Sequence, residues 1–154
     1  MAAAGVNLVL GTDGADNHDM MRVTTLMAGL FKDARRDTDL FPAHQAVEMA
    51  TLNGARAMGL QDEIGSLAVG MKADIVLHDT DRPEWRPLHN AVNQLVWSAD
   101  GRGVHSVWVD GVRVVDDYRC TTIDEERLCA DAQVAADALV GRSGLPTMSA
   151  WPIS

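Results

Sequence analysis

Residues 7–14 read Asn-Leu-Val-Leu-Gly-Thr-Asp-Gly, and the predicted fold class starts from this segment. Its apolar run, Leu8 to Leu10, is typical of a short strand that is buried on both faces. The glycines that follow end the strand and leave Asp13 at its C-terminal tip. In a (β/α) barrel the chemistry lies at such strand ends, so the position favours a working carboxylate. The alternative is that Asp13 only caps a turn or the next helix, as Asp before Gly often does.

Composition limits the classes of partner. The chain has 154 residues, enough for one domain with a real core. It carries 13 basic and 22 acidic side chains, a net charge of −9, which disfavours nucleic acid and anionic membranes as partners. Cys120 and Cys129 form no Cys-x-x-Cys pair and no secretory leader is recognisable, so we expect reduced thiols in a cytoplasmic protein.

Apolar residues at spacings of three and four predict three helices. The first spans about residues 19–34, after cap candidates such as Asp19. The second spans about 42–58, starts at Pro42, is broken by Asn53-Gly54 and ends at Gly59. The third spans about 123–139 and opens with the capping box Thr122-x-x-Glu125.

Between residues 60 and 121 the pattern changes to strands and turns. The segment 65–70 has glycine at both ends, which predicts tight turns that bring the backbone close to a neighbouring layer. Residues 73–79 and 94–97 are each predicted to form a strand. Residues 106–115 place two β-rich runs around Asp110-Gly111, which predicts a hairpin with a type I′ turn.

Four motifs in series carry a family resemblance. They are AGVNLVLGTDG with Asp19-Met20, MATLNGARA at 49–57, GSLAVGMKADIV at 65–76, and Val107-x-Val109-Asp110-Gly111. Over residues 3–135, and in this order, the chain resembles the C-terminal third of the amidohydrolase superfamily. The most similar branch is that of the cytosine-deaminase-like enzymes, which includes S-adenosylhomocysteine and methylthioadenosine deaminases, guanine deaminase and triazine chlorohydrolases.

The resemblance implies an α/β fold. The chain would form the C-terminal portion of a metal-dependent (β/α)8 barrel, part of a composite β-sandwich and a C-terminal helix. Residues 1–60 would be the last strand and closing helices of the barrel. Residues 61–121 would be the sandwich portion with its hairpin, and residues 122–154 the C-terminal helix and tail.

The resemblance also implies a chemistry. Asp13 would be the aspartate of the eighth strand, which contacts the catalytic metal and shuttles protons. One divalent metal is expected, zinc first and iron as the alternative. The reaction would be hydrolytic deamination or dechlorination of an amino- or chloro-substituted nitrogen heterocycle. His18, near Asp13, is a candidate substrate contact, and its alternative is an ordinary surface histidine at a helix start.

The sequence departs from the family in its metal ligands. The family's His-x-His pair and its further histidines would lie before Met1, and a catalytic zinc takes three protein ligands plus water. The remaining histidines have no metal-site spacing: His44 is predicted to be solvated in the first turn of a helix, and His78, His89 and His105 are not expected to be metal ligands. Asp74, at a strand start, is predicted to be structural.

Two functions therefore remain open. In the first, the chain is a piece of a metal-dependent hydrolase, completed by a missing N-terminal barrel half or by a homo-oligomer. In the second, it is a truncated, non-catalytic fragment that serves only as a structural or assembly module. Loss of the other barrel strands would leave the edges of strand 7–10 unpaired and its apolar faces exposed to water, which predicts self-association or disorder near the N-terminus.

Overall fold

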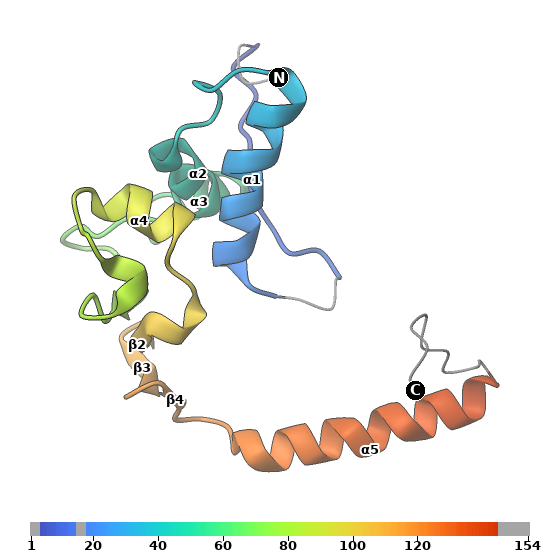
Figure 1. Ribbon diagram of the computed structural model, residues 1–154. Coiled ribbons are helices and arrows are strands. Elements are labelled where there is room, and N and C mark those ends of the chain that lie inside the picture. Colours follow the sequence, from blue (N-terminus) through green and yellow to red (C-terminus); the bar gives the residue numbers. More distant parts are fainter. Residues whose placement is uncertain (1–3, 15–17, 145–154) are drawn as a thin grey trace. The chain divides into compact units, whose positions relative to one another are not determined.

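The computed structural model describes residues 4–14 and 18–144 (Figure 1). The chain divides into two compact units, Met1–Arg119 and Cys120–Ser154. Among the described residues, the first unit holds four α-helices and most of a small sheet, and the second holds one long helix. This division comes from the contacts of the chain, and the predicted division at residues 60 and 121 stays a prediction.

Helix α1, Met20–Arg35, confirms the first predicted helix. The Asp19 carboxylate caps it by accepting hydrogen bonds from the backbone N–H groups of Met21 and Arg22, at 2.9 and 3.3 Å. The helix ends where Arg36 takes a left-handed conformation. Ala28 lies completely buried on the inner face of this helix.

The second predicted helix is two helices in the structure, α2 at Ala43–Ala50 and α3 at Leu52–Met58. The break lies at Thr51, whose φ of −128° and ψ of −90° are not helical, rather than at the predicted Asn53-Gly54. The Thr51 hydroxyl donates to the Val47 carbonyl at 2.8 Å, a local bond that competes with the helical pattern. Gly59, with φ of 73°, ends α3 as predicted.

The strand predicted at residues 94–97 is wrong, because these residues belong to helix α4, Ala91–Trp97. Asn90 caps this helix by accepting a hydrogen bond from the Asn93 N–H at 2.9 Å. A short apolar run has no periodicity that separates a strand from a buried helix, and here the cap and the packing decide. Val96 is only 1% exposed and packs with three buried alanines of α1 and α2, Ala28, Ala43 and Ala46.

The sheet has the strand order β1-β2-β3-β4. Its strands are β1 at Ile75–His78, β2 at Val104–Val109, β3 at Val112–Asp116 and β4 at Arg119–Cys120. The first three pair antiparallel, and the predicted hairpin is confirmed by φ values of 49° at Asp110 and 78° at Gly111. Asp74 has a structural contact, since its carboxylate accepts a hydrogen bond from the Asp110 N–H at 2.6 Å.

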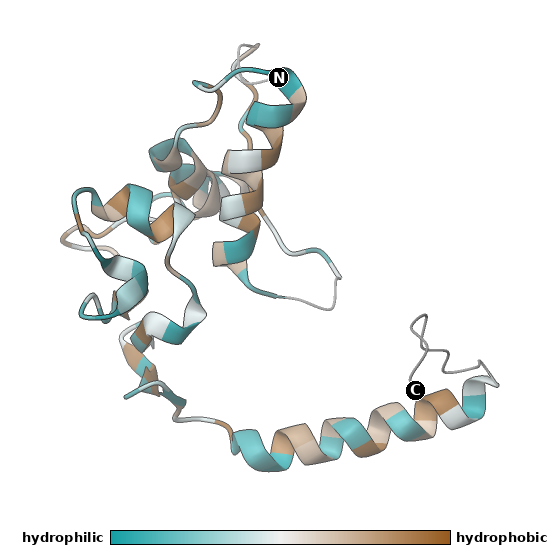
Figure 2. Cartoon of the chain, in the orientation of Figure 1, coloured by the Kyte–Doolittle hydropathy of each residue, from teal (hydrophilic) through white to brown (hydrophobic). Residues whose placement is uncertain are grey.

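Short 3-10 helices precede α4 and β2, η2 at Pro83–Trp85 and η3 at Gly101–Gly103. The second unit contains α5, Glu125–Ser143, along which polar and apolar residues alternate (Figure 2). Its cap is the carboxylate of Asp124, which accepts from the Arg127 N–H at 3.0 Å, so the predicted capping box at Thr122 is wrong. None of the described helices is both long enough and apolar enough to cross a membrane.

The strand predicted at residues 8–10 is also not formed. Within residues 4–14 and 18–144 this segment has no partner strand, and it runs without regular secondary structure. A strand exists only through a ladder of hydrogen bonds to a neighbour, so an apolar run alone does not make one. The barrel itself therefore stays a prediction.

Candidate functional site

Asp13 lies in a turn at the end of the segment that begins at Asn7. Its φ of 54° is left-handed, a conformation that Asp tolerates better than most residues. The N–H of Gly14 donates to Asp13 Oδ1 at 2.7 Å, which holds the carboxylate beside its own backbone. The side chain is exposed, so the carboxylate is accessible to a ligand or a substrate.

His18 comes close to the same turn. Its Nδ1 lies 3.3 Å from the hydroxyl of Thr12, the residue before Asp13, and the two atoms share a hydrogen bond. Both predicted site residues are therefore anchored to the segment 12–14, and both are exposed. The contact supports a shared location and leaves the substrate role of His18 as a prediction.

Hydrogen bonds to the helices hold the segment that leads to Asp13. The side-chain amide of Asn53 donates to the Leu8 carbonyl at 3.0 Å, and the side-chain amide of Asn7 donates to the Asn53 carbonyl at 3.0 Å. The Leu10 N–H donates to the Met49 carbonyl at 3.2 Å. We call these three bonds the strand clamp.

The strand clamp depends on the break between α2 and α3. In a continuous helix the Met49 carbonyl would accept from the N–H four residues later, at Asn53. Because the regular helix is interrupted at Thr51, the Met49 carbonyl accepts from the Leu10 N–H instead. No sequence pattern predicted this role. The only available signal was an asparagine inside a predicted helix, where Asn is unfavourable.

The described residues do not by themselves hold a catalytic metal. A zinc site needs three protein ligands, and the segment around Asp13 offers one carboxylate. Within residues 4–14 and 18–144, no group of three His, Cys, Asp or Glu side chains has the arrangement of a metal site. Any metal bound at Asp13 would need further ligands from beyond these residues.

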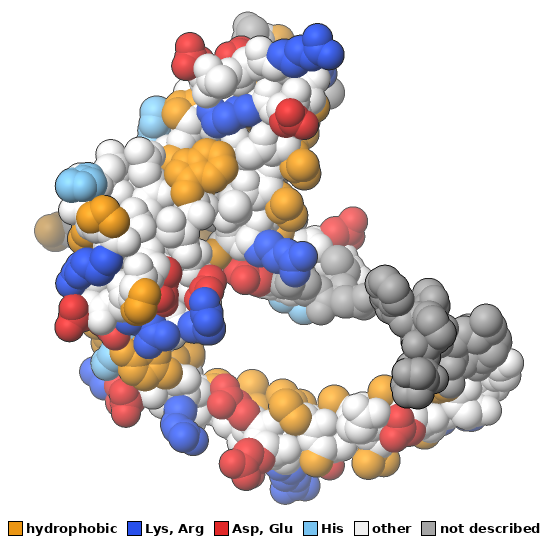
Figure 3. Space-filling view, in the orientation of Figure 1, with side chains coloured by type: hydrophobic (Ala, Val, Ile, Leu, Met, Phe, Trp, Pro, Cys, Tyr) orange, Lys and Arg blue, Asp and Glu red, His pale blue; other side chains and the backbone are white. Residues whose placement is uncertain are grey.

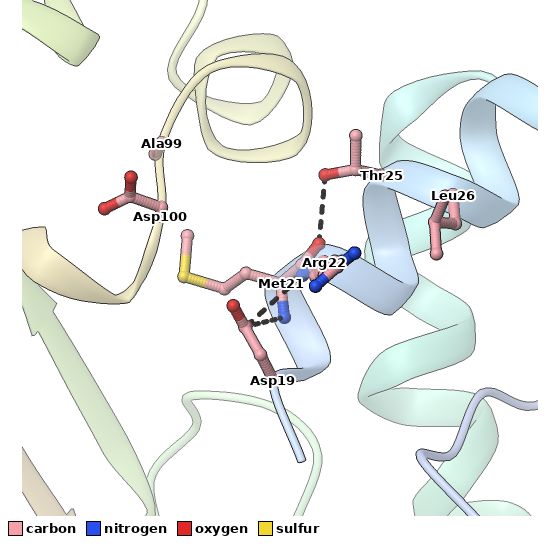
Figure 4. Close-up of a pocket in the computed structure, with 7 residues that line it drawn as sticks. All are labelled: Asp19, Met21, Arg22, Thr25, Leu26, Ala99 and Asp100. Carbon is pink, nitrogen blue, oxygen red and sulfur yellow. Dashed lines mark hydrogen bonds between the residues drawn. The ribbon is translucent and has the colours of Figure 1, made fainter. Parts of the chain in front are cut away.

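A cavity of about 260 Å³ lies between the start of α1 and the segment after α4 (Figure 4). Its lining includes the capping Asp19, Arg22 and Asp100, but neither Asp13 nor His18. Asp100 is already paired with Arg102 at 2.6 Å, and Asp19 is engaged by two backbone N–H groups. The carboxylates of this cavity are thus occupied in structural bonds.

A polar cluster lies at the end of β1. The Tyr118 hydroxyl donates to Asp79 Oδ2 at 2.8 Å, and the Arg82 guanidinium lies over the Tyr118 ring, 5.9 Å from its centroid. Hydrogen bonds from the Asp81 N–H and from Tyr118 lower the pKa of Asp79, and burial lowers the pKa of His78. These perturbed groups join the sheet to the loop after it, and they lie outside the Asp13 segment.

Comparison with known proteins places the chain in a family. Residues 1–114 match the amidohydrolase family. The 5-methylthioadenosine/S-adenosylhomocysteine deaminase of Moorella thermoacetica is 44% identical over 133 residues, 84% of this chain and 31% of that enzyme. The 5′-deoxyadenosine deaminase of Methanosarcina acetivorans is 40% identical over 146 residues, 93% of this chain and 33% of that enzyme.

Solved structures agree with this assignment. An adenosine deaminase from Xanthomonas campestris with bound zinc matches with a TM-score of 0.86 and 35% identity, over 89% of this chain and 32% of its own. The atrazine chlorohydrolase of Arthrobacter aurescens, complexed with zinc, matches with a TM-score of 0.79 and 25% identity, over 86% and 30%. The chain thus spans about a third of the length of these relatives. By the match over residues 1–114 and by these identities, the chain belongs to the amidohydrolase family.

Proposed function

We propose that this chain forms part of an amidohydrolase that removes the amino group from the purine of an adenosine-type nucleoside, with Asp13 as the residue that moves the proton. The observation that carries the proposal is the exposed Asp13 carboxylate in a chain 44% identical to a methylthioadenosine/S-adenosylhomocysteine deaminase. Dechlorination of a triazine is the second chemistry, but the atrazine chlorohydrolase is more distant, at 25% identity.

For this reaction Asp13 needs an accessible carboxylate oxygen that can accept a proton and release it again. Water adds to the ring carbon that bears the amino group, and Asp13 accepts the proton that the water loses. The same carboxyl then gives that proton to the amino group, and ammonia leaves. The proton of the remaining hydroxyl passes to the neighbouring ring nitrogen, which took the electron pair of the C=N bond when water added, and the ring carbon becomes a carbonyl. Asp13 ends the cycle ionised again. His18, held near Thr12, is proposed to contact the substrate on the same side.

We further propose that the intact enzyme holds one divalent metal, with zinc supported by the two solved relatives that contain it. When bound, zinc supplies a water of lowered pKa. This chain would contribute the Asp13 carboxylate, and the remaining ligands would come from outside the described residues. The alternative to all of these roles is a non-catalytic structural or assembly module.

The test is a hybrid enzyme. This chain replaces the 133-residue stretch that it matches in the Moorella thermoacetica deaminase. Ammonia release is then measured with 5′-methylthioadenosine, S-adenosylhomocysteine, 5′-deoxyadenosine and, for the second chemistry, chloride release with atrazine. We expect deamination by the hybrid, and a loss of at least about 100-fold in kcat for Asp13→Asn, the size of a general acid-base contribution.

Asp13→Asn is a clean variant because Asn also tolerates a left-handed backbone and can accept the Gly14 hydrogen bond. We expect its unfolding free energy to stay within about 0.5 kcal/mol of the parent. A folded hybrid without activity would favour the structural module. Full turnover by Asp13→Asn would remove the proton role of Asp13.

A further inference from the structure

We propose that Asn53 is a positioning residue for Asp13, acting through the strand clamp. The inference rests on the proposed function, because it gives Asn53 a role only if Asp13 reacts. Asn53 lies on α3, far from Asp13 in sequence, yet it donates to the Leu8 carbonyl and receives the Asn7 side chain on its own carbonyl. Two asparagines thus bond the segment and the helix reciprocally.

Both polar atoms of the Asn53 side chain form hydrogen bonds. While its Nδ2 donates to Leu8, its Oδ1 accepts a hydrogen bond from the Arg56 guanidinium at 3.1 Å. The Arg56 bond orients the amide, because the oxygen faces the cation and the nitrogen therefore faces the segment. The bond to Leu8 leaves the helix and caps no helix terminus, so it joins the segment to α3 and does not support α3 itself.

The strand clamp bonds the segment before Asp13 at two backbone positions, Leu8 and Leu10. The Leu8 carbonyl is held by Asn53, and the Leu10 N–H is held by the Met49 carbonyl. Only Gly11 and Thr12 separate Leu10 from Asp13. An added Cβ at Gly11 would meet no other atom within 4 Å, so little else packs against the chain there. The clamp thus makes the last contacts of this segment with α2 and α3 before the carboxylate.

Asn53→Asp separates positioning from helix stability. The change keeps the side-chain size and the acceptor for Arg56, but a carboxylate cannot donate to the Leu8 carbonyl. Asp is also favourable near a helix N-terminus, so α3 itself should not weaken. The matched control is Asn93→Asp, which adds the same charge at an exposed position near the start of α4. Asn7→Asp removes the other half of the reciprocal pair.

The first measurement uses the full 154-residue chain and amide hydrogen exchange followed by NMR. In Asn53→Asp we expect the Leu10 amide to exchange about tenfold faster, the effect of losing one neighbouring hydrogen bond. The Ala55 amide, bonded to the Thr51 carbonyl within α3, should keep its rate. Equal Leu10 rates in Asn53→Asp and Asn93→Asp would overturn the clamp.

The second measurement reports the position of Asp13 directly. The Gly14 amide donates to Asp13 Oδ1 at 2.7 Å, so its rate of hydrogen exchange reports whether the carboxylate keeps this position. If Asn53 positions Asp13, the Gly14 amide exchanges faster in Asn53→Asp and in Asn7→Asp, and keeps its exchange rate in Asn93→Asp. An unchanged Gly14 response in all three variants would leave Asn53 with a structural role only and would overturn the proposal.

The hybrid enzyme separates the two proposals. There Asn53→Asp should lower kcat about tenfold with little change in KM. A misplaced Asp13 stabilises the transition state less, but substrate binding does not depend on it. An inactive parent hybrid would defeat the proposed function, while the Gly14 and Leu10 results would still decide whether Asn53 holds Asp13. An active hybrid with normal kcat in Asn53→Asp would defeat the positioning role alone.

Discussion

At the residue scale, His78 is expected to make the stability of the chain depend on pH. Its ring lies against Trp85, with centroids 5.6 Å apart, and Trp85 is only 3% exposed. Within the described residues, His78 Nδ1 and Trp85 Nε1 are buried without a hydrogen-bond partner. Burial lowers the pKa of His78, because a charged imidazolium is poorly solvated there.

The direction of the pH effect follows from this shift. The unfolded chain binds a proton at His78 at a higher pH than the folded chain does, so the free energy of unfolding falls as pH drops through about 6.5. Urea unfolding at about pH 7.5 and about pH 5.5 should show this loss in the parent and a smaller loss in His78→Gln. Identical pH dependence in both proteins would show that His78 does not contribute.

At the element scale, the junction of α2 and α3 depends on a close approach by Gly65. Its φ of 93° is left-handed, as the predicted tight turn requires. A Cβ on Gly65 would lie 2.9 Å from the Ala55 Cβ and 3.3 Å from the Thr51 carbonyl oxygen. The loop therefore packs directly onto the helix break that frees the Met49 carbonyl.

Gly65→Ala should destabilise the chain by about 2 to 4 kcal/mol, from a left-handed alanine and from overpacking against Ala55. Gly70→Ala is the matched control, because Gly70 has a φ of 92° but open space around its Cβ. It should lose only the backbone part, about 1 to 2 kcal/mol. Chemical unfolding measures both, and equal losses would contradict the close-packing account.

Gly54→Ala is expected to act in the opposite direction. Gly54 lies within α3, and a Cβ there would meet no atom within 4 Å. Alanine removes conformational freedom from the unfolded chain, so the unfolding free energy should rise by about 0.5 to 1 kcal/mol. A destabilised Gly54→Ala variant in the same unfolding experiment would show that the junction needs a flexible residue there.

At the scale of the whole molecule, much apolar surface faces solvent. On the face seen in Figure 3, hydrophobic side chains reach the surface between charged ones. Val76, Val109 and Val112 are 51% to 63% exposed, and the pairings Val76↔Val107 and Val109↔Val112 put them on one face of the sheet. A sheet with an open apolar face and an edge strand favours association.

We therefore expect the 154-residue chain to self-associate. Sedimentation velocity should show a mass that rises with concentration, and Val112→Lys should reduce it by placing a charge on the sheet face. Val69→Lys is the matched control, since Val69 is fully exposed outside the sheet. A monomer at all concentrations, or equal effects of the two lysines, would contradict this role of the sheet.

Local chemistry made several features predictable. The Asp19 cap, the end of α3 at Gly59 and the Asp110-Gly111 turn each depend on residues within a few positions, so sequence reasoning found them. The helix at 91–97 was missed because the three-residue apolar run Leu95–Trp97 is too short to show a helical period. Asp13 could be singled out as a candidate, whereas the hydrogen bond from Asn53 to Leu8, in the segment that leads to Asp13, spans 45 positions and was not visible.

The sequence by itself determined the family, through motifs in series, and the local elements whose caps and turns are encoded by neighbouring residues. Tertiary structure decided the rest: that residues 8–10 are held by the Asn7 and Asn53 amides instead of by a sheet, and that α2 and α3 part at Thr51 to free a carbonyl. The physical reason is the separation in sequence between the groups that form each hydrogen bond. Caps and turns close their hydrogen bonds within a few residues, but a strand or a clamp acquires its structure only from partners that the fold brings to it.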